Sequence, residues 1–292
     1  MINIKDFNHF KWIEQTAILN DILNESNEIT VSHLPRGLEA EVIRVNSKYG
    51  RAVVKIWNQG LSTDVNYQYK LLQVLFDTGV SVSKPYGWGY DEDSNKVLVT
   101  SFDGKSVSTV DEQTIKVISG LLVEIHRTSI NQLDTSMHRK FDFIDYFFPG
   151  LTEHKDIHNI LGRLVEQSNM QQDCIIHGDF NLGNILEEQG RFTIIDWTNA
   201  QLGDVRYDVA WSGFLMLIYT DEESYRVFIK TYMEMNGFPE EQLKLFEAIA
   251  CLRWILLNRI VTLPKNYNTL SIINNMLDTN IHLNEISRIY EK

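Results

Sequence analysis

The chain has 292 residues, of which 43% are hydrophobic and 23% charged, so it can bury a sizeable core and has room for two domains or two lobes. Its formal net charge of −12 argues against nucleic acid as the main partner. Two cysteines are too few for a disulfide scaffold, the start lacks a signal-peptide pattern, and no apolar run is long enough to span a bilayer. These features predict a cytoplasmic protein.

The first hundred residues are predicted to form a small antiparallel sheet with one helix. Apolar residues alternate in 28–35 and 38–46, and the apolar segment 51–57 follows after a turn, as expected for a three-stranded meander. Segment 63–79 has apolar residues at helical spacing and ends in glycine. Segment 84–102 has the pattern of a hairpin. The N-terminal part is therefore expected to hold five strands and one helix.

After Phe102, apolar residues recur mainly at helical spacing. Thr109 and Glu112 form a capping-box pattern at the start of a predicted helix that ends near 127. Its expected buried stripe consists of Ile115, Ile118, Leu122 and Ile125. Further helices are predicted near 156–169, 205–218, 222–236, 239–261 and 269–290. We therefore expect an α+β chain with a smaller lobe over 1–102 and a larger, mainly helical lobe over 103–292.

One stretch, 174–197, places polar residues among apolar runs. Its second half predicts a hairpin with a turn around Gln189 and Gly190. With Gly190 at the midpoint, Asn184 would face Asp196 across the strands at about 5 Å. An amide oxygen and a carboxylate at that spacing suit one magnesium ion, which keeps coordination positions for water and substrate phosphates.

Asp179 lies five residues before Asn184, on the loop that enters this hairpin. A carboxylate there can accept a proton from a substrate hydroxyl. Taken singly, such residues are more often turn or cap residues than catalytic ones. Their combination, one base and two metal ligands, favours phosphoryl transfer, in which positioning and charge neutralisation supply most of the catalysis.

The catalytic stretch resembles a signature of the aminoglycoside phosphotransferase-like family, which has the protein-kinase-like fold: it reads HGDFNLGNIL and then IIDW. The following AQLGDVRYDVAW is similar to the Gly-Asp-x-x-x-Asp-Leu-Ala of that family. The resemblance implies that Asp179 is the catalytic base and that Asn184 and Asp196 bind magnesium. It also implies that His177 and Asp208 support the loop.

For the donor nucleotide, ATP or GTP, the resemblance implies a site in the smaller lobe. Lys55 would contact the α- and β-phosphates, although a lysine whose head group reaches solvent from an edge strand gives the same pattern. Gly37 belongs to a weak match of the phosphate-covering turn. The backbones of Thr100 and Phe102 would contact the edge of the base. Gln68 stands where family members commonly carry a glutamate that pairs with the lysine.

The resemblance covers about 30–215 and implies a magnesium-dependent transferase that moves the γ-phosphoryl group to a hydroxyl of a small molecule. Candidate acceptors are an antibiotic, such as an aminoglycoside or a macrolide, and a metabolite, such as an amino alcohol or a sugar. A cationic acceptor would suit the acidic C-terminal part, but the same acidic residues also suit helix starts. They are Asp221, Glu222, Glu223, Glu240 and Glu241.

Two other functions stay open. A nucleotide-binding, pseudokinase-like protein without turnover is favoured by Gln68, which gives Lys55 no ion pair; Asp64, one helical turn earlier, is a shorter substitute. A protein kinase is disfavoured, because only the segment WTNAQLG separates Asp196 from Asp204. That segment leaves little room for a platform that binds a peptide.

Overall fold

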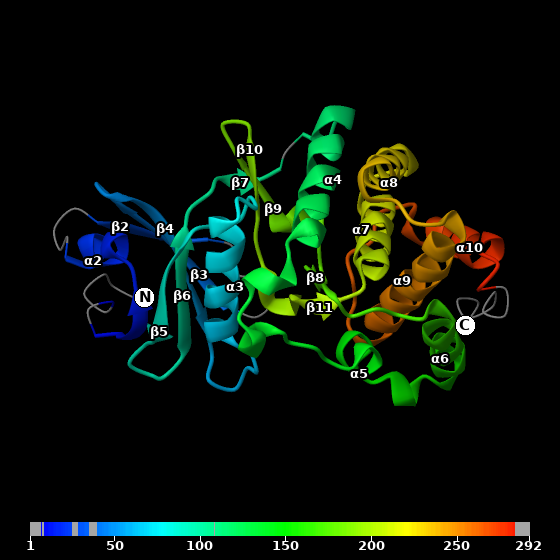
Figure 1. Ribbon diagram of the computed structural model, residues 1–292, viewed down its shortest axis with the longest axis horizontal. Helices are drawn as coiled ribbons and strands as arrows, with labels where there is room; N and C mark the ends of the chain where they lie inside the picture. The colour runs from blue at the N-terminus through cyan, green and yellow to red at the C-terminus, as the bar shows by residue number, and fades with distance from the viewer. Residues whose placement is uncertain (1–6, 8, 25–28, 35–39, 108, 284–292) are drawn as a thin grey trace. The chain divides into compact units, whose positions relative to one another are not determined.

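The computed structural model describes residues 7, 9–24, 29–34, 40–107 and 109–283 (Figure 1). The chain forms two compact units. The first unit comprises Met1–Lys105 and Leu186–Thr198, and the second comprises Ser106–Ile185 and Asn199–Lys292. Leu186–Thr198 thus packs with the first unit although it follows much later in the chain.

The first unit is built on an antiparallel sheet of six strands. They are β1 (Lys11–Gln15), β2 (Thr30–His33), β3 (Ala40–Ser47), β4 (Gly50–Trp57), β5 (Pro85–Tyr90) and β6 (Lys96–Ser101). Their order in the sheet is β1-β5-β6-β4-β3-β2. The five predicted strands are confirmed, and β1 is an additional one. It lacks an alternating pattern because the apolar residues Trp12 and Ile13 are adjacent, and its place is set by pairing with β5.

Two helices accompany this sheet in the described part of the first unit, where one was predicted. The predicted one is α3 (Val65–Asp77), and the additional one is α2 (Ala17–Asn24), whose Leu19 and Ile22 are buried. Asp64 is the N-cap of α3 and accepts a hydrogen bond from the backbone N–H of Tyr67 at 3.0 Å. Asp64 therefore caps the helix and does not substitute for the glutamate of the family.

The predicted hairpin consists of β9 (Ile185–Glu188) and β10 (Arg191–Ile194), and β9 also pairs with β7 (Lys105–Ser106). Gln189 and Gly190 form a two-residue turn with φ of 53° and 82°, as in a type I′ turn. The turn is thus centred between these two residues and not on Gly190. Strand β9 begins after Asn184, and β10 ends before Asp196. Neither residue lies in the hairpin, so their predicted cross-strand pairing is wrong.

The second unit is mainly helical. Its helices are α4 (Glu112–Arg127), α5 (Phe143–Phe147), α6 (Lys155–Ser168), α7 (Val205–Tyr219), α8 (Glu222–Asn236), α9 (Glu240–Ile260) and α10 (Thr269–Thr279). Two short strands, β8 (Cys174–Ile176) and β11 (Gln201–Gly203), pair antiparallel. Short 3₁₀ turns span Ile130–Gln132, Thr135–Met137, Leu151–Glu153, Leu182–Asn184 and Trp197–Asn199, the last of which crosses the boundary between the units.

The helices predicted from periodicity are confirmed, with two corrections. The cap of α4 is Asp111, which accepts from the backbone N–H of Thr114 at 2.8 Å, so the predicted capping box at Thr109 is wrong. The last helix ends at Thr279, earlier than predicted, and 284–290 of that prediction lie outside the described residues.

Helices α7 and α9 lie in the middle of the second unit, where α7 also packs against α8 and α9 against α6 (Figure 1). Both helices bury residues around most of their circumference, including Phe214, Phe246 and Trp254. Asp221 caps α8, and Glu240 begins α9, as expected for carboxylates at helix starts. Among the described residues, no helix has both the length and the apolar character that crossing a membrane requires.

Candidate active site

The loop that carries Asp179 runs from β8 to the 3₁₀ turn Leu182–Asn184 in the second unit. Its backbone is held by Asp208, in the first turn of α7. The fully buried carboxylate of Asp208 accepts hydrogen bonds from the backbone N–H of His177 at 2.8 Å and of Gly178 at 2.9 Å. Helix α7 thereby fixes the two residues that precede Asp179.

Asp208 remains ionised although it is buried. Burial by itself raises its pKa, but the hydrogen bond and charge of His126, together with His177, outweigh burial and bring the pKa below its usual value. His126 Nε2 lies 3.1 Å from Asp208 Oδ2, and its Nδ1 lies 2.6 Å from the hydroxyl of Tyr232. An ionised carboxylate is the stronger acceptor for the two loop N–H groups.

Asp179 is half-buried and is fixed from several sides. Its Oδ1 accepts a hydrogen bond from Nε1 of Trp211 at 3.2 Å. Its backbone N–H donates to Nδ1 of His177 at 3.3 Å, and its backbone oxygen accepts from the side-chain amide of Asn181 at 3.0 Å. A carboxylate held in this way can meet an incoming hydroxyl in one orientation.

The side chain of Asn184 is oriented by the same loop. Its Nδ2 donates to the backbone oxygen of Asp179 at 2.9 Å and lies 3.5 Å from Asp179 Oδ2. Since the NH₂ end of the amide is used in this way, its Oδ1 is the atom that can coordinate a hard cation. The donor set of Asn184 therefore fits a magnesium ligand.

Asp196 lies in the first unit, two residues after β10. Its backbone is left-handed, with φ of 66°, a conformation that few residues other than glycine adopt. Its side chain is exposed, and its Oδ1 accepts from the hydroxyl of Thr198 at 3.0 Å. An exposed carboxylate whose orientation is supported by a hydrogen bond is also suited to bind magnesium. The described residues contain no group of three or more His, Cys, Asp and Glu side chains that could hold a metal.

Gln68 is buried in α3 and is linked to Asp196 through one hydroxyl group. Its Nε2 donates to Oγ1 of Thr198 at 3.5 Å, and Thr198 in turn donates to Asp196. Lys55 lies half-buried on β4, and its ammonium group forms no hydrogen bond or ion pair with any residue that the structure describes. The structure thus connects Gln68 to the aspartate and not to the lysine.

The other residues that were predicted to contact the nucleotide are Thr100, Phe102 and Gly37. Thr100 lies inside β6, where it pairs with Val53 of β4, so its backbone belongs to the sheet. The N–H of Phe102 donates to the backbone oxygen of Arg51 at 3.1 Å, so this part of the Phe102 backbone is already engaged within the first unit. Gly37 lies outside the described residues.

Arg253 of α9 was missed by the sequence reasoning. Its buried guanidinium donates to the backbone oxygen of Gly178 at 3.1 Å and to the hydroxyl of Tyr207 at 2.6 Å. It also lies 4.1 Å from the ring centre of Trp211, the residue that holds Asp179. The available signal was a single charge inside the apolar run ACLRWILL.

The model of the Phosphotransferase enzyme family (APH) matches residues 30–246. Hygromycin-B 4-O-kinase of Escherichia coli is 35% identical over 78 residues, which are 23% of this chain and 22% of that kinase. The Protein LicA homolog of Mycoplasma capricolum subsp. capricolum is 21% identical over 165 residues, 55% of this chain and 67% of that protein. The first alignment thus spans less than a quarter of its curated relative.

Solved structures share the fold at low sequence identity. Aminoglycoside phosphotransferase APH(4)-Ia has a TM-score of 0.64 at 14% identity, over 92% of this chain and 98% of that chain. Choline kinase LicA from Streptococcus pneumoniae has a TM-score of 0.57 at 16% identity, over 89% and 96%. The protein-kinase-like fold predicted from the motifs is confirmed, with six strands in place of five. Because the family match spans most of its length, the chain belongs to the phosphotransferase enzyme family.

Proposed function

We propose that this protein is a magnesium-dependent kinase that transfers the γ-phosphoryl group of ATP or GTP to a hydroxyl of a small molecule. The observation that carries the proposal is the fixed loop around Asp179, whose carboxylate is oriented by Trp211 and whose backbone is held by Asp208. An enzyme of this class needs such a preorganised base, because most of the catalysis comes from positioning.

In the proposed reaction Asp179 orients the acceptor hydroxyl and takes its proton. The hydroxyl oxygen bonds to the γ-phosphorus while the bond from that phosphorus to the β–γ bridging oxygen breaks, and the nucleoside diphosphate leaves. The half-buried position of Asp179 leaves its carboxylate reachable for a substrate, and the hydrogen bond from Trp211 keeps it from rotating away.

Asn184 and Asp196 are the proposed magnesium ligands, and bound magnesium would neutralise charge on the phosphate oxygens. Lys55 is proposed to contact the α- and β-phosphates, which suits a lysine that has no ion-pair partner among the described residues. Gly37 is proposed to lie in the turn that covers the phosphates. The backbones of Thr100 and Phe102 are proposed to meet the edge of the base, for which Phe102 would use its carbonyl group, because its N–H is engaged by Arg51.

The acceptor is proposed to be an antibiotic, such as an aminoglycoside or a macrolide, or a metabolic alcohol, such as an amino alcohol or a sugar. The two curated relatives support this range, since one is named for hygromycin B and the other as a homologue of LicA, and a solved LicA is described as a choline kinase. A cytoplasmic location is proposed because ATP and GTP are available there and both cysteines are free.

The test is magnesium-dependent nucleotide consumption across aminoglycosides, macrolides, amino alcohols and sugars, with Asp179→Asn as the control. We expect one acceptor class to stimulate consumption in the wild type and not in the variant. Nucleotide binding without stimulation by any acceptor would instead support the nucleotide-binding protein without turnover, which the sequence had left open because of Gln68.

A further inference from the structure

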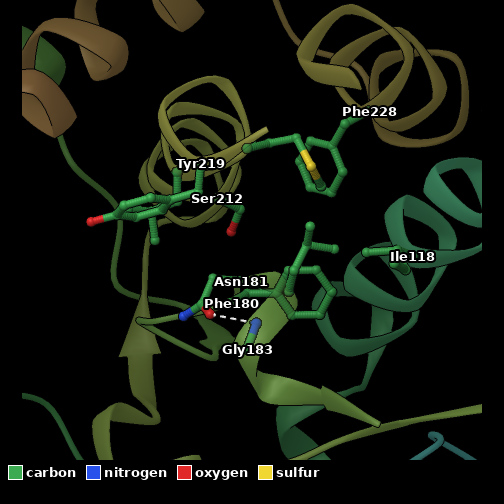
Figure 2. Close-up of a pocket in the computed structure, with 10 residues that line it drawn as sticks. Ile118, Phe180, Asn181, Gly183, Ser212, Tyr219 and Phe228 are labelled. Carbon is green, nitrogen blue, oxygen red and sulfur yellow. Dashed lines mark hydrogen bonds between the residues drawn. The ribbon is translucent and has the colours of Figure 1, made fainter. Parts of the chain in front are cut away.

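A cavity of about 150 Å³ lies in the second unit beside the loop of Asp179 (Figure 2). Its walls come from that loop and from helices α4, α7 and α8. The lining residues are Ile118, Phe180, Asn181, Leu182, Gly183, Ser212, Leu215, Met216, Tyr219 and Phe228. Most of these side chains are apolar and buried, whereas Tyr219 is 41% exposed and lies at the rim. The cavity is therefore apolar inside and reachable from solvent.

One wall of the cavity is the segment that joins Asp179 to Asn184. The side chain of Asn181 connects this wall to the base, because its Nδ2 donates to the backbone oxygen of Asp179 at 3.0 Å. Its Oδ1 accepts from the N–H of Gly183 at 2.9 Å, the bond marked in Figure 2. Two residues span at most about 7 Å between Cα atoms, so the wall begins within that distance of Asp179. The cavity therefore adjoins the loop that carries the proposed base.

A second wall continues the face of α7 that holds the catalytic loop. Asp208, Trp211, Leu215 and Tyr219 follow one another at spacings of three and four residues, which places them on one side of the helix. Asp208 binds the loop backbone and Trp211 binds Asp179, while Leu215 and Tyr219 line the cavity. Along α7, the residues that line the cavity therefore follow directly after Trp211, which contacts Asp179.

The polar groups of the lining are already used within the protein. Ser212 Oγ donates to the backbone oxygen of Asp208 at 2.7 Å. The hydroxyl of Tyr219 accepts from Nε1 of Trp254 at 3.4 Å and points away from the cavity (Figure 2). No charged residue is among the lining residues. The cavity therefore suits an uncharged apolar group, and its volume is that of a cavity that takes up benzene.

We propose that this cavity binds an apolar substituent of the acceptor, an aryl or branched alkyl group on the molecule whose hydroxyl meets Asp179. The inference rests on the proposed function and narrows it. Among hydroxyl compounds the enzyme should prefer those with one apolar substituent over wholly polar ones. Burial of that substituent removes apolar surface from water, which strengthens binding of the acceptor beside the base.

The first test compares matched acceptors in matched variants. The acceptor pairs are 2-aminoethanol with N-benzyl-2-aminoethanol, and methyl with phenyl β-D-glucopyranoside. Leu215→Phe places a larger side chain in the cavity and narrows it, and Leu217→Phe makes the same substitution on α7 at a partly buried residue that does not line it. We expect the wild type and Leu217→Phe to favour the aryl member of a pair by about tenfold or more in kcat/KM. Leu215→Phe should lose this preference and keep turnover of the polar member.

A binding measurement separates failure of this inference from failure of the proposed function. Benzene should raise the melting temperature of the wild type and of Leu217→Phe, but not that of Leu215→Phe. Turnover without an aryl preference, or with a preference that Leu215→Phe retains, would overturn the inference and leave the proposed function standing. A benzene shift without turnover of any acceptor would overturn the proposed function and, with it, the assignment of the cavity to the acceptor.

Discussion

Trp211 of helix α7 donates its indole N–H to Oδ1 of Asp179 at 3.2 Å. The same indole stacks on the guanidinium of Arg253, 4.1 Å from the ring centre, and that guanidinium donates to the backbone oxygen of Gly178. The side chain and the backbone around Asp179 are therefore positioned by one pair of residues from two central helices. The role of Trp211 is to position the carboxylate.

Trp211→Phe should lower kcat by about tenfold or more and change KM little. The reason is that a hydrogen bond to a charged group contributes about 1.5–3 kcal/mol, and here it sets the orientation of Asp179. Steady-state kinetics with a turned-over acceptor measure this change. Trp254→Phe is the control, because its indole donates to Tyr219 and not to Asp179, and it should keep kcat near the wild-type value. Equal losses in the two variants would contradict the positioning role.

Asp208→Asn should destabilise the fold by about 3 kcal/mol at neutral pH, because it breaks a buried charged network. The folded-state pKa of Asp208 is below the ordinary value of 3.8. Its stabilising contribution is therefore present above that ordinary value and is lost as the pH falls through the depressed folded pKa. Urea unfolding of both proteins between pH 3 and 7 measures the difference, which should shrink toward pH 3. A difference that stays constant across this range would refute the assignment.

The parts of the fold that were predicted correctly are those with a local pattern. The stripe Ile115, Ile118, Leu122 and Ile125 is buried in α4 as its spacing indicates. Strand β1 was missed because its five residues do not alternate between apolar and polar types, and because its position depends on pairing with Tyr90 and its neighbours. The cap of α4 was misplaced by two residues, since Asp111 and Thr109 are both good caps and only the backbone geometry decides between them.

The residues of the candidate site also divide into those with a local sequence pattern and those whose contacts are made between distant segments. Asp179, Asn184 and Asp196 were predicted from the residue types and spacing of a local motif, and their roles stay predictions. Arg253 and Trp211 were missed because their contacts with the loop join segments that are far apart in the sequence; Arg253 and Gly178 are separated by 75 positions. A local motif points to candidate residues for contact with the substrate, whereas the side chains that position these candidates depend on tertiary packing, which a single sequence does not reveal.

Cys174 should react slowly with iodoacetamide in the folded protein. Burial, followed by the charge of Asp173 and a hydrogen bond to it, raises the pKa of the Cys174 thiol from 9.0 to about 11. Only the thiolate reacts, so alkylation near neutral pH should be on the order of 100-fold slower than in the unfolded chain. Mass spectrometry of a Cys251→Ala variant, with and without urea, measures this ratio. Similar rates in the two states would show that the thiol is not shielded.

The hydroxyl group of Thr198 should contribute to magnesium binding. It receives a hydrogen bond from Gln68 at 3.5 Å and donates one to Asp196 at 3.0 Å, which holds a left-handed aspartate in one orientation. Thr198→Val keeps the shape but removes the hydroxyl, and it should raise the magnesium concentration for half-maximal activity by about three- to tenfold. At saturating magnesium kcat should recover. A magnesium titration of activity measures both effects.

Thr198→Ser is the matched control, because it keeps the hydroxyl and removes only a methyl group. It should need nearly the same magnesium concentration as the wild type. Gln68→Ala removes the other end of the hydrogen-bond chain and should shift the titration in the same direction as Thr198→Val, by less, because Thr198 still reaches Asp196. If instead Gln68→Ala lowered kcat at saturating magnesium while Thr198→Val changed nothing, Gln68 would act independently of Asp196. Its contact with Thr198 would then have no part in metal binding.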